Sequence, residues 1–417
     1  MKLEILAESE IIVTFFALSL LLLSAFIFGN LFEKIKGPRV VGEIIGGMVI
    51  GGSCLFLLFP DFMKSIFFAY PEEGKVLNIF YQLGLVFLMF LSGYNTEIKI
   101  DKRNLKTISL VFIGSTIIPM LCAVPFLNLF KDYFIGSINN NLSFSLVFCI
   151  GVAITSIPVI SKIFFDMGVM NTKFSNTILT VSTFQDLILW IFLNMAIRIS
   201  STGVFNLVDM LVVVGITLCL FIVMIFVSKN IKQIKSKIDT KVFYTVSFIL
   251  LLVVCALLSE VGINIMYSSF LVGYFVKSIF GNDKSIKDGI NYFEKFVFSL
   301  FVPIYFALVG IQLNVIHDFS LLRFFMFFIV AFGLEFVGTW IMLLFSKLSR
   351  NVRLNFCVTM NARGGPGIVL ATVAYANNII NLEFFTVLIL TTMLSSMIAG
   401  YFLRYQYSKN ENVFNEL

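Results

Sequence analysis

Gln185 and Asp186 place an amide and a carboxylate side by side in an apolar run that extends from about residue 174 to residue 199. A run of this length is sufficient to cross a bilayer as a helix. A carboxylate at mid-membrane costs about 2.5–3.5 kcal/mol even on the lenient insertion scale, so a residue of this kind is expected to have a function. Asp186 is therefore the first candidate for binding a proton or a monovalent cation, with the Gln185 amide oxygen as a neighbouring ligand.

Two other apolar runs are interrupted near their middles by helix-breaking or hydroxyl-bearing residues. These residues are Thr155, Ser156, Pro158, Asn361, Gly364, Gly365, Pro366 and Gly367. A broken helix frees backbone N–H and C=O groups that lipid cannot satisfy, so it persists only where a cavity, an ion or polar side chains satisfy them. Half-helix ends also carry partial charges of about 0.5. The two breaks predict a cation site, to which the Thr155 and Ser156 hydroxyls contribute beside Asp186.

Glu335 and Arg363 also fall at the midpoints of their apolar runs. In one interpretation Arg363 neutralises a carboxylate within a buried network that includes Asn361. In another, Glu335 is a second proton carrier, and in a third it is a protonated carboxyl held by local hydrogen bonds. Lys162, just past the first break, either closes the cytoplasmic mouth of the pathway or anchors the chain at the membrane surface.

The composition of the chain is typical of a membrane protein. Of the 417 residues, 59% are hydrophobic and only 13% are charged, whereas soluble domains carry about 25% charged residues. The six Cys residues are scattered without a CxxC spacing and there is a single His, which argues against disulfides, a zinc site and His-based catalysis. With no intramembrane catalytic motif, we expect no enzyme and no cofactor.

Window reading of the apolar runs predicts an all-α polytopic membrane protein with about thirteen transmembrane helices. The expected spans are 11–30, 38–58, 76–93, 107–130, 143–165, 174–199, 206–228, 242–259, 262–280, 292–314, 322–346, 353–376 and 383–403.

Loop charges support this division. One alternating set of loops holds 23 of the 30 Lys and Arg residues, and the other set holds 6. By the positive-inside rule the N-terminus is expected outside and the C-terminus in the cytoplasm. The net charge of +6 is thus an orientation signal that favours anionic lipid as a partner and does not indicate nucleic acid.

The expected domains follow the spans. Residues 1–227 form a first transmembrane half with a connector span, 228–241 a cytoplasmic linker, 242–403 a second half, and 404–417 a cytoplasmic tail. The odd connector gives the halves opposite orientations, and the two broken spans occupy matching positions. Paired interruptions in inverted repeats are the best sequence indication of a transporter binding site. Because the tail is short, we expect any soluble regulatory domain to come from a separate cytoplasmic subunit.

Five segments in order resemble the monovalent cation:proton antiporter superfamily, nearest its Kef-type and bacterial sodium/proton branches. The segments are residues 41–51, 83–93, 155–158, 303–314 and 361–364. The resemblance implies two crossed discontinuous helices, a homodimer, and a mobile core domain beside a scaffold in a bacterial cytoplasmic (inner) membrane. Gln185-Asp186 is the Kef-type arrangement, where sodium-type relatives have two Asp residues. Glu335 departs from the family, which usually has a basic residue there.

These observations together predict a secondary antiporter that exchanges K⁺ or Na⁺ for H⁺, with K⁺ slightly favoured and Asp186 binding proton and cation by turns. Pairing one carboxylate with one cation makes the exchange electroneutral, unless Glu335 carries a second proton. A sodium-coupled organic-solute symporter of similar fold and a gated cation efflux channel are the alternatives.

Overall fold

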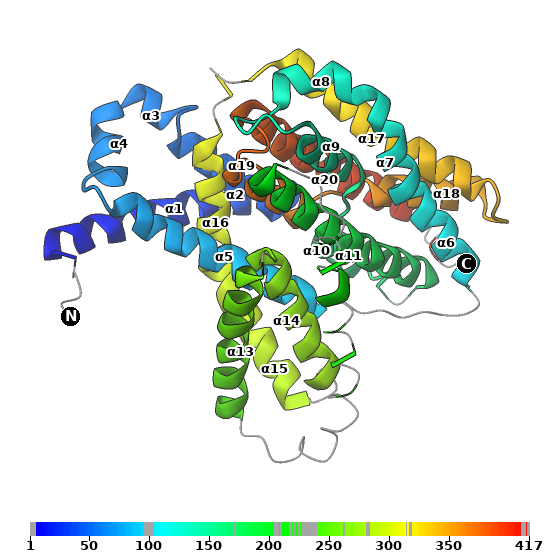
Figure 1. Ribbon diagram of the computed structural model, residues 1–417, viewed down its shortest axis with the longest axis horizontal. Helices are drawn as coiled ribbons and strands as arrows, with labels where there is room; N and C mark the ends of the chain where they lie inside the picture. Colours follow the sequence, from blue (N-terminus) through cyan, green and yellow to red (C-terminus); the bar gives the residue numbers. More distant parts are fainter. Residues whose placement is uncertain are drawn as a thin grey trace. The chain divides into compact units, whose positions relative to one another are not determined.

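The computed structural model describes residues 6–95, 104–170, 172–203, 240–261, 263–280, 284–313 and 319–409, together with isolated positions between 208 and 226, residues 315–316 and Phe414. In these residues the structure is helical, apart from one isolated β-bridge between Ile135 and Ile380 (Figure 1). Ten helical segments of the described chain are long and apolar enough to cross a membrane. They are Glu8–Lys34, Arg39–Leu58, Glu73–Asn95, Leu105–Phe134, Asn141–Phe165, Lys173–Thr202, Val242–Glu260, Ile286–Gln312, Leu321–Leu343 and Leu382–Lys409.

Every expected span except one coincides with these segments, with the shorter apolar helix Ile265–Phe280, or with a pair of half-helices at 350–376. The exception, the connector 206–228, lies largely outside the described residues, as do the linker 228–241 and most of the tail beyond residue 409.

The chain forms two compact units, each assembled from one segment of either half of the sequence. The first unit comprises Met1–Tyr94 and Met224–His317. Its helices are α1 (Glu8–Lys34), α2 (Arg39–Ile50), α3 (Leu55–Leu58), α4 (Pro60–Phe67), α5 (Glu73–Asn95), α13 (Thr240–Glu260), α14 (Ile265–Phe280), α15 (Lys284–Ser299) and α16 (Phe301–Gln312).

Helices α2 and α16 of the first unit cross with their backbones in contact. A Cβ added to Gly47 would lie 2.1 Å from the Ala307 carbonyl oxygen, and one added to Gly310 would lie 2.1 Å from that of Ile44. Only glycine permits this approach, which is how small residues bring helices together in membranes.

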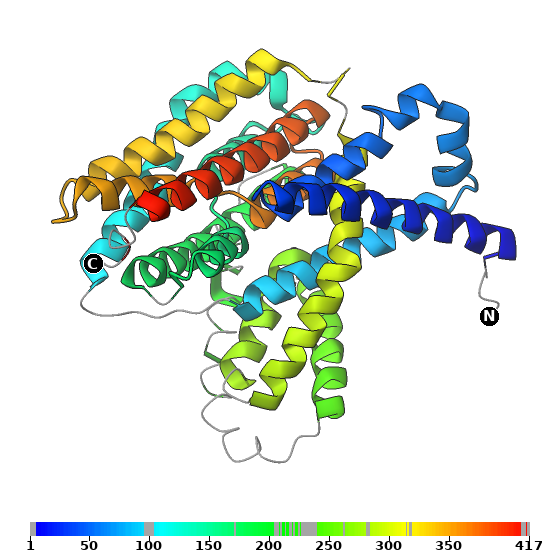
Figure 2. The same ribbon diagram turned by 180° about the vertical axis from the view of Figure 1, so that it is seen from behind.

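The second unit comprises Asn95–Val223 and Asp318–Leu417. Its helices are α6 (Leu105–Phe112), η2 (Ile113–Ile117), α7 (Ile118–Ala123), η3 (Val124–Phe126), α8 (Leu127–Phe134), α9 (Asn141–Ala153), α10 (Ile157–Asp166), α11 (Lys173–Thr202), α17 (Leu321–Leu343), α18 (Arg350–Met360), α19 (Gly365–Ala376) and α20 (Leu382–Lys409). In Figure 2, α17 and α20 run beside each other, and they also pack in contact. All candidate site residues lie in this unit.

Two expected spans are less regular than the hydropathy pattern suggested. Helix α2 ends at Ile50 and the chain turns at residues 51–54 before α3, where Gly51 and Gly52 weaken the helix. The span 107–130 contains the π-helical turn η2 and the 3-10 turn η3. Pro119 and Pro125 remove backbone donors there, so a continuous α-helix cannot form all its hydrogen bonds.

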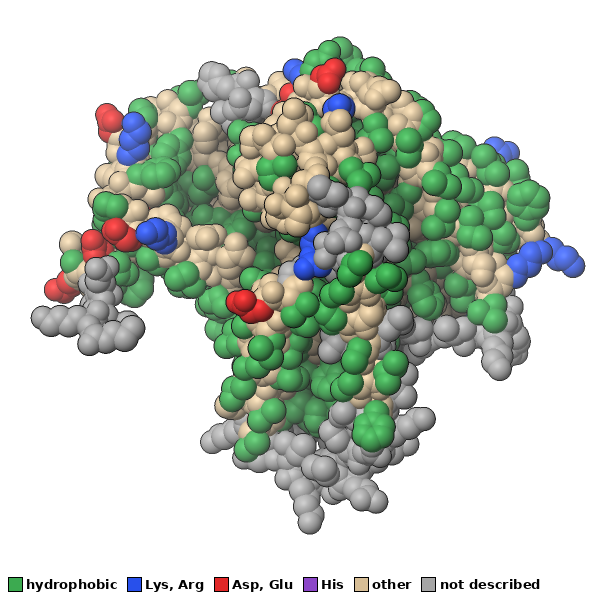
Figure 3. Space-filling model, viewed as in Figure 1, with side chains coloured by type: hydrophobic (Ala, Val, Ile, Leu, Met, Phe, Trp, Pro, Cys, Tyr) green, Lys and Arg blue, Asp and Glu red, His purple; other side chains and the backbone are tan. Residues whose placement is uncertain are grey.

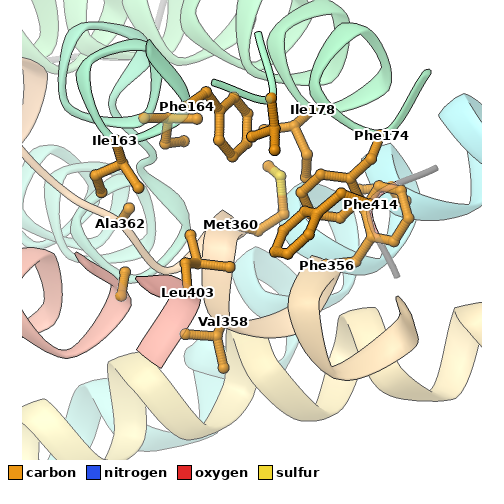
Figure 4. Close-up of a cluster of buried hydrophobic side chains, with 14 of the residues drawn as sticks. Ile163, Phe164, Phe174, Ile178, Phe356, Val358, Met360, Ala362, Leu403 and Phe414 are labelled. Atoms are coloured by element: carbon orange, nitrogen blue, oxygen red, sulfur yellow. The ribbon is translucent and has the colours of Figure 1, made fainter. Parts of the chain in front are cut away.

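A hydrophobic cluster fixes the ends of four helices of the second unit, as Figure 4 shows. Its members include Ile163, Phe164, Phe174, Ile178, Phe356, Met360, Ala362, Leu403 and Phe414. Burial of each large side chain contributes about 1.5–3 kcal/mol. Since Met360 and Ala362 flank Asn361, this packing also holds the second helix break in place.

The outer surface is largely apolar. In Figure 3, hydrophobic side chains cover much of the described helices on the face shown, and Lys, Arg, Asp and Glu are sparse. Helix α1, for example, leaves Phe15, Phe16 and Phe26 more than half exposed, as expected of side chains that contact lipid.

Candidate functional site

Both predicted helix breaks are present, and they meet. Helix α9 ends at Ala153 and α10 begins at Ile157, while α18 ends at Met360 and α19 begins at Gly365. The Ser156 N–H donates to the Ala362 carbonyl oxygen at 2.8 Å. Pro366 stands four residues after Ala362 and has no N–H, so it cannot donate to this carbonyl, which bonds across the breaks instead.

Gly364 allows this crossing. A Cβ at Gly364 would lie 2.4 Å from Val159 Cγ2 and 2.5 Å from Ser156 Oγ. Any larger residue would push α19 away from the start of α10. Pro158 and Pro366 each stand in the first turn of the half-helix that follows its break, a position where a missing N–H removes no helical hydrogen bond.

Polar side chains satisfy the carbonyls at the ends of α9 and α18. Arg363 Nη2 donates to the Val152 carbonyl oxygen at 2.7 Å, and Gln185 Nε2 donates to that of Ala153. Thr155 Oγ1 donates to the Met360 carbonyl oxygen at 2.6 Å. Helix ends buried in protein require such partners, so the breaks are supported from several helices.

Asn361 contributes to the same end of α18, because its Nδ2 donates to the Cys357 carbonyl oxygen at 3.0 Å. Ser156 caps α10, where its Oγ accepts from the Val159 N–H at 3.4 Å. Gly365 and Gly367 are buried in the first turn of α19. Lys162 lies exposed on α10.

Arg363 and Glu335 form a buried ion pair. Arg363 Nη2 lies 2.9 Å from Glu335 Oε2, and the two side chains are 1% and 0% exposed. The same nitrogen also donates to the Ala331 carbonyl oxygen at 3.1 Å. Thr155 Oγ1 lies 3.2 Å from Glu335 Oε1, so the pair joins α17 to both breaks. Among the described residues Arg363 thus has Glu335, and not Asp186, as its ion-pair partner.

Asp186 is the carboxylate that remains available. It is 2% exposed, and its Oδ2 has no hydrogen-bond partner among the described residues. Gln185 Oε1 is also buried and has no hydrogen-bond partner among the described residues. A buried polar group without a partner is unfavourable unless a ligand or water satisfies it. No group of three His, Cys, Asp or Glu side chains suited to a multivalent metal occurs in the described part of the chain.

Ser115, in the π-turn η2, is a contact that sequence reasoning missed. Its carbonyl oxygen accepts from Gln185 Nε2 at 3.4 Å. The signal in the sequence was Pro119, because a proline four residues after Ser115 deprives that carbonyl of its α-helical donor.

The family model of the sodium/hydrogen exchanger, transmembrane, matches residues 21–405. The chain belongs to this family. Membership in a family of membrane transporters agrees with the expectation that the protein is no enzyme and crosses the membrane several times.

Relatives of this sodium/hydrogen exchanger family member cover almost all of the chain at low identity. It is 22% identical over 377 residues to the cation/H(+) antiporter 17 of Arabidopsis thaliana, which covers 88% of this chain. The chain spans about half the length of that curated plant relative (45%). It is 23% identical to the Na(+)/H(+) antiporter of Enterococcus hirae, with 93% of this chain and 96% of the relative covered.

The solved structure of the sodium proton antiporter MjNhaP1 from Methanocaldococcus jannaschii superimposes with a TM-score of 0.69 at 14% identity, covering 98% of this chain and 99% of that one. The expected antiporter fold, an all-helical membrane architecture, is therefore confirmed.

Proposed function

We propose that the protein exchanges a monovalent cation for H⁺ across a membrane, and that Asp186 binds the two in turn. The observation that carries this proposal is the buried, unpartnered Oδ2 of Asp186 in the unit that contains both helix breaks. The buried charged groups Glu335 and Arg363, also at the breaks, form an ion pair with each other. The names of the relatives, which are cation/H⁺ and Na⁺/H⁺ antiporters, point to the same reaction.

The exchange follows from competition for one carboxylate. Deprotonated Asp186 attracts a cation that has lost part of its hydration, and the Gln185 amide oxygen, the Thr155 and Ser156 hydroxyls and freed carbonyls supply further oxygen ligands. Protonation removes the negative charge and releases the cation. The two ions cannot occupy the carboxylate together, so each crossing carries one of them and the fluxes are coupled.

Glu335 and Arg363 act in this proposal as a fixed clamp on the two breaks. A carboxylate neutralised by an arginine has no free proton to exchange, which leaves Asp186 as the single carrier and makes the exchange of one cation for one H⁺ electroneutral. Asn361 belongs to the same network, and Lys162 serves as a gating residue at the cytoplasmic mouth. The transported cation is K⁺ or Na⁺, and the Gln185-Asp186 arrangement favours K⁺.

The proposed setting is a bacterial cytoplasmic membrane, with the N-terminus outside and the C-terminus in the cytoplasm, as the 23 to 6 division of basic loop residues indicates. The protein is proposed to work as a homodimer in contact with anionic lipid, and a separate cytoplasmic subunit is a candidate regulator.

The test is pH-gradient dissipation in proteoliposomes on addition of Na⁺, K⁺ or Li⁺, with and without a clamped membrane potential. Asp186→Asn should abolish cation-induced proton movement, whereas Asp132→Asn, which changes an exposed carboxylate of α8, should leave it unchanged. Normal exchange in Asp186→Asn would overturn the proposal. Rates that depend on the potential would overturn the one-to-one stoichiometry alone.

A further inference from the structure

The π-turn η2 is a further irregularity of the second unit, beside the two helix breaks and the 3-10 turn η3. The Ile118 N–H bonds to the Ile113 carbonyl oxygen, five residues back. Pro119 has no N–H to offer Ser115, so the Ser115 carbonyl faces Gln185 instead. Single π-turns within α-helices are frequent at functional sites.

The two hydroxyls of this turn are buried and have no hydrogen-bond partner among the described residues. Ser115 and Thr116 are both 0% exposed, and neither hydroxyl oxygen has a hydrogen-bond partner in the described residues. Other buried helical hydroxyls of the unit do have a partner: Thr183 donates to the Leu179 carbonyl oxygen and Thr386 to that of Leu382, each at 2.9 Å.

Further unpartnered oxygens belong to the helices in contact with this turn. Gly114 packs so closely on α17 that a Cβ there would lie 2.7 Å from Thr339 Cα. The Thr339 Oγ1 is buried and has no partner among the described residues, like Gln185 Oε1 and Asp186 Oδ2 on α11. Buried oxygens of this kind are what a dehydrated monovalent cation requires, since carbonyl and hydroxyl oxygens replace its hydration shell.

We propose that the π-turn supplies ligands to the transported cation. The hydroxyls of Ser115 and Thr116 and the Ser115 carbonyl replace water molecules as the cation reaches the Gln185-Asp186 pair. The turn thereby sets the apparent affinity for the cation and the preference among Li⁺, Na⁺ and K⁺, while Asp186 supplies the charge. This inference rests on the proposed exchange at Asp186 and adds a third helix to its ligand set.

The experiment compares Ser115→Ala and Thr116→Val with matched controls in proteoliposomes, measuring KM and maximal rate for Li⁺, Na⁺ and K⁺. The controls are Ser395→Ala and Thr386→Val, buried hydroxyls of the same unit that donate to helix carbonyls. Each π-turn variant should raise KM for the preferred cation roughly tenfold, which corresponds to about 1.4 kcal/mol, and should change the ratio of KM values among the cations. The maximal rate and the controls should stay within about twofold of the parent protein. Thr116→Ser, which keeps the hydroxyl, should have the same KM as the parent protein.

If KM values and cation ratios are unchanged in both π-turn variants while Asp186→Asn shows no exchange, this inference is overturned and the proposed exchange at Asp186 is kept. An active Asp186→Asn would instead overturn the exchange mechanism. A loss of folded protein in both Ser115→Ala and Thr116→Val would assign the two hydroxyls to packing and also overturn the inference.

Discussion

The Glu335–Arg363 pair gives the sharpest test of how the helix breaks are held. Replacing Glu335 by Gln leaves a 1% exposed guanidinium without its carboxylate, and removal of one partner of a buried pair costs about 3–5 kcal/mol. Arg363→Met costs a similar amount. In the double variant Glu335→Gln/Arg363→Met no charge is left unpaired, and the chief loss is the donor to the Val152 carbonyl oxygen, worth about 1–3 kcal/mol.

The double variant should therefore be more stable than either single variant, with a coupling free energy of at least about 2 kcal/mol. The measurement is a double-mutant cycle on purified protein, with the free energy of unfolding taken from denaturant titrations in detergent. Because Glu335 is a clamp and no carrier in our proposal, the double variant should also retain Asp186-dependent exchange. Destabilisations that simply add, or a Glu335→Gln variant that loses less than about 1 kcal/mol, would refute the reasoning.

Three further predictions concern the crossing, the packing and the orientation. Gly364→Ala should lower the free energy of unfolding by about 1–3 kcal/mol and slow exchange, because the added Cβ would clash with Val159 and Ser156. Thermal unfolding and transport assays measure the two effects. The control is Gly333→Ala, where no atom lies within 4 Å of the added Cβ. Phe356→Ala should cost about 3–5 kcal/mol in a detergent unfolding titration, since its ring lies fully buried 4.6 Å from that of Phe174; a cost below 1 kcal/mol would contradict the packing seen in Figure 4. Because the C-terminus is proposed to lie in the cytoplasm, green fluorescent protein fused after Leu417 should fluoresce and alkaline phosphatase fused there should be inactive. The opposite pair of results would reverse the proposed orientation.

The membrane architecture was readable from the sequence because lipid restricts what a chain can do. Long apolar runs had to become helices, and the interruptions at residues 155–158 and 361–367 had to become breaks. The same reasoning singled out Asp186, Glu335 and Arg363, since each ionisable group at such depth requires a partner or a function.

What the sequence could not supply was the choice of partners. Three ionisable residues at one depth allow several pairings, and only the tertiary structure shows that Arg363 bonds to Glu335. The Thr155 hydroxyl, which we propose as a cation ligand, also donates to the Met360 carbonyl oxygen, a partner that the sequence does not identify. Such contacts depend on how helices pack in three dimensions, between residues 28 apart for Arg363 and Glu335 and 205 apart for Thr155 and Met360, which periodicity does not encode.

The prolines provide a more specific rule than hydropathy does. A proline within a helix removes the donor to the carbonyl four residues earlier, so Pro119, Pro158 and Pro366 mark the carbonyls of Ser115, Ile154 and Ala362. In the structure two of these bond to residues of other helical segments, Ser115 to Gln185 and Ala362 to Ser156. In these two cases a carbonyl that the proline cannot donate to accepts its hydrogen bond from a neighbouring segment. In a membrane, where water does not reach such an oxygen, the polar side chains gathered around it define where an ion can exchange its hydration shell for protein.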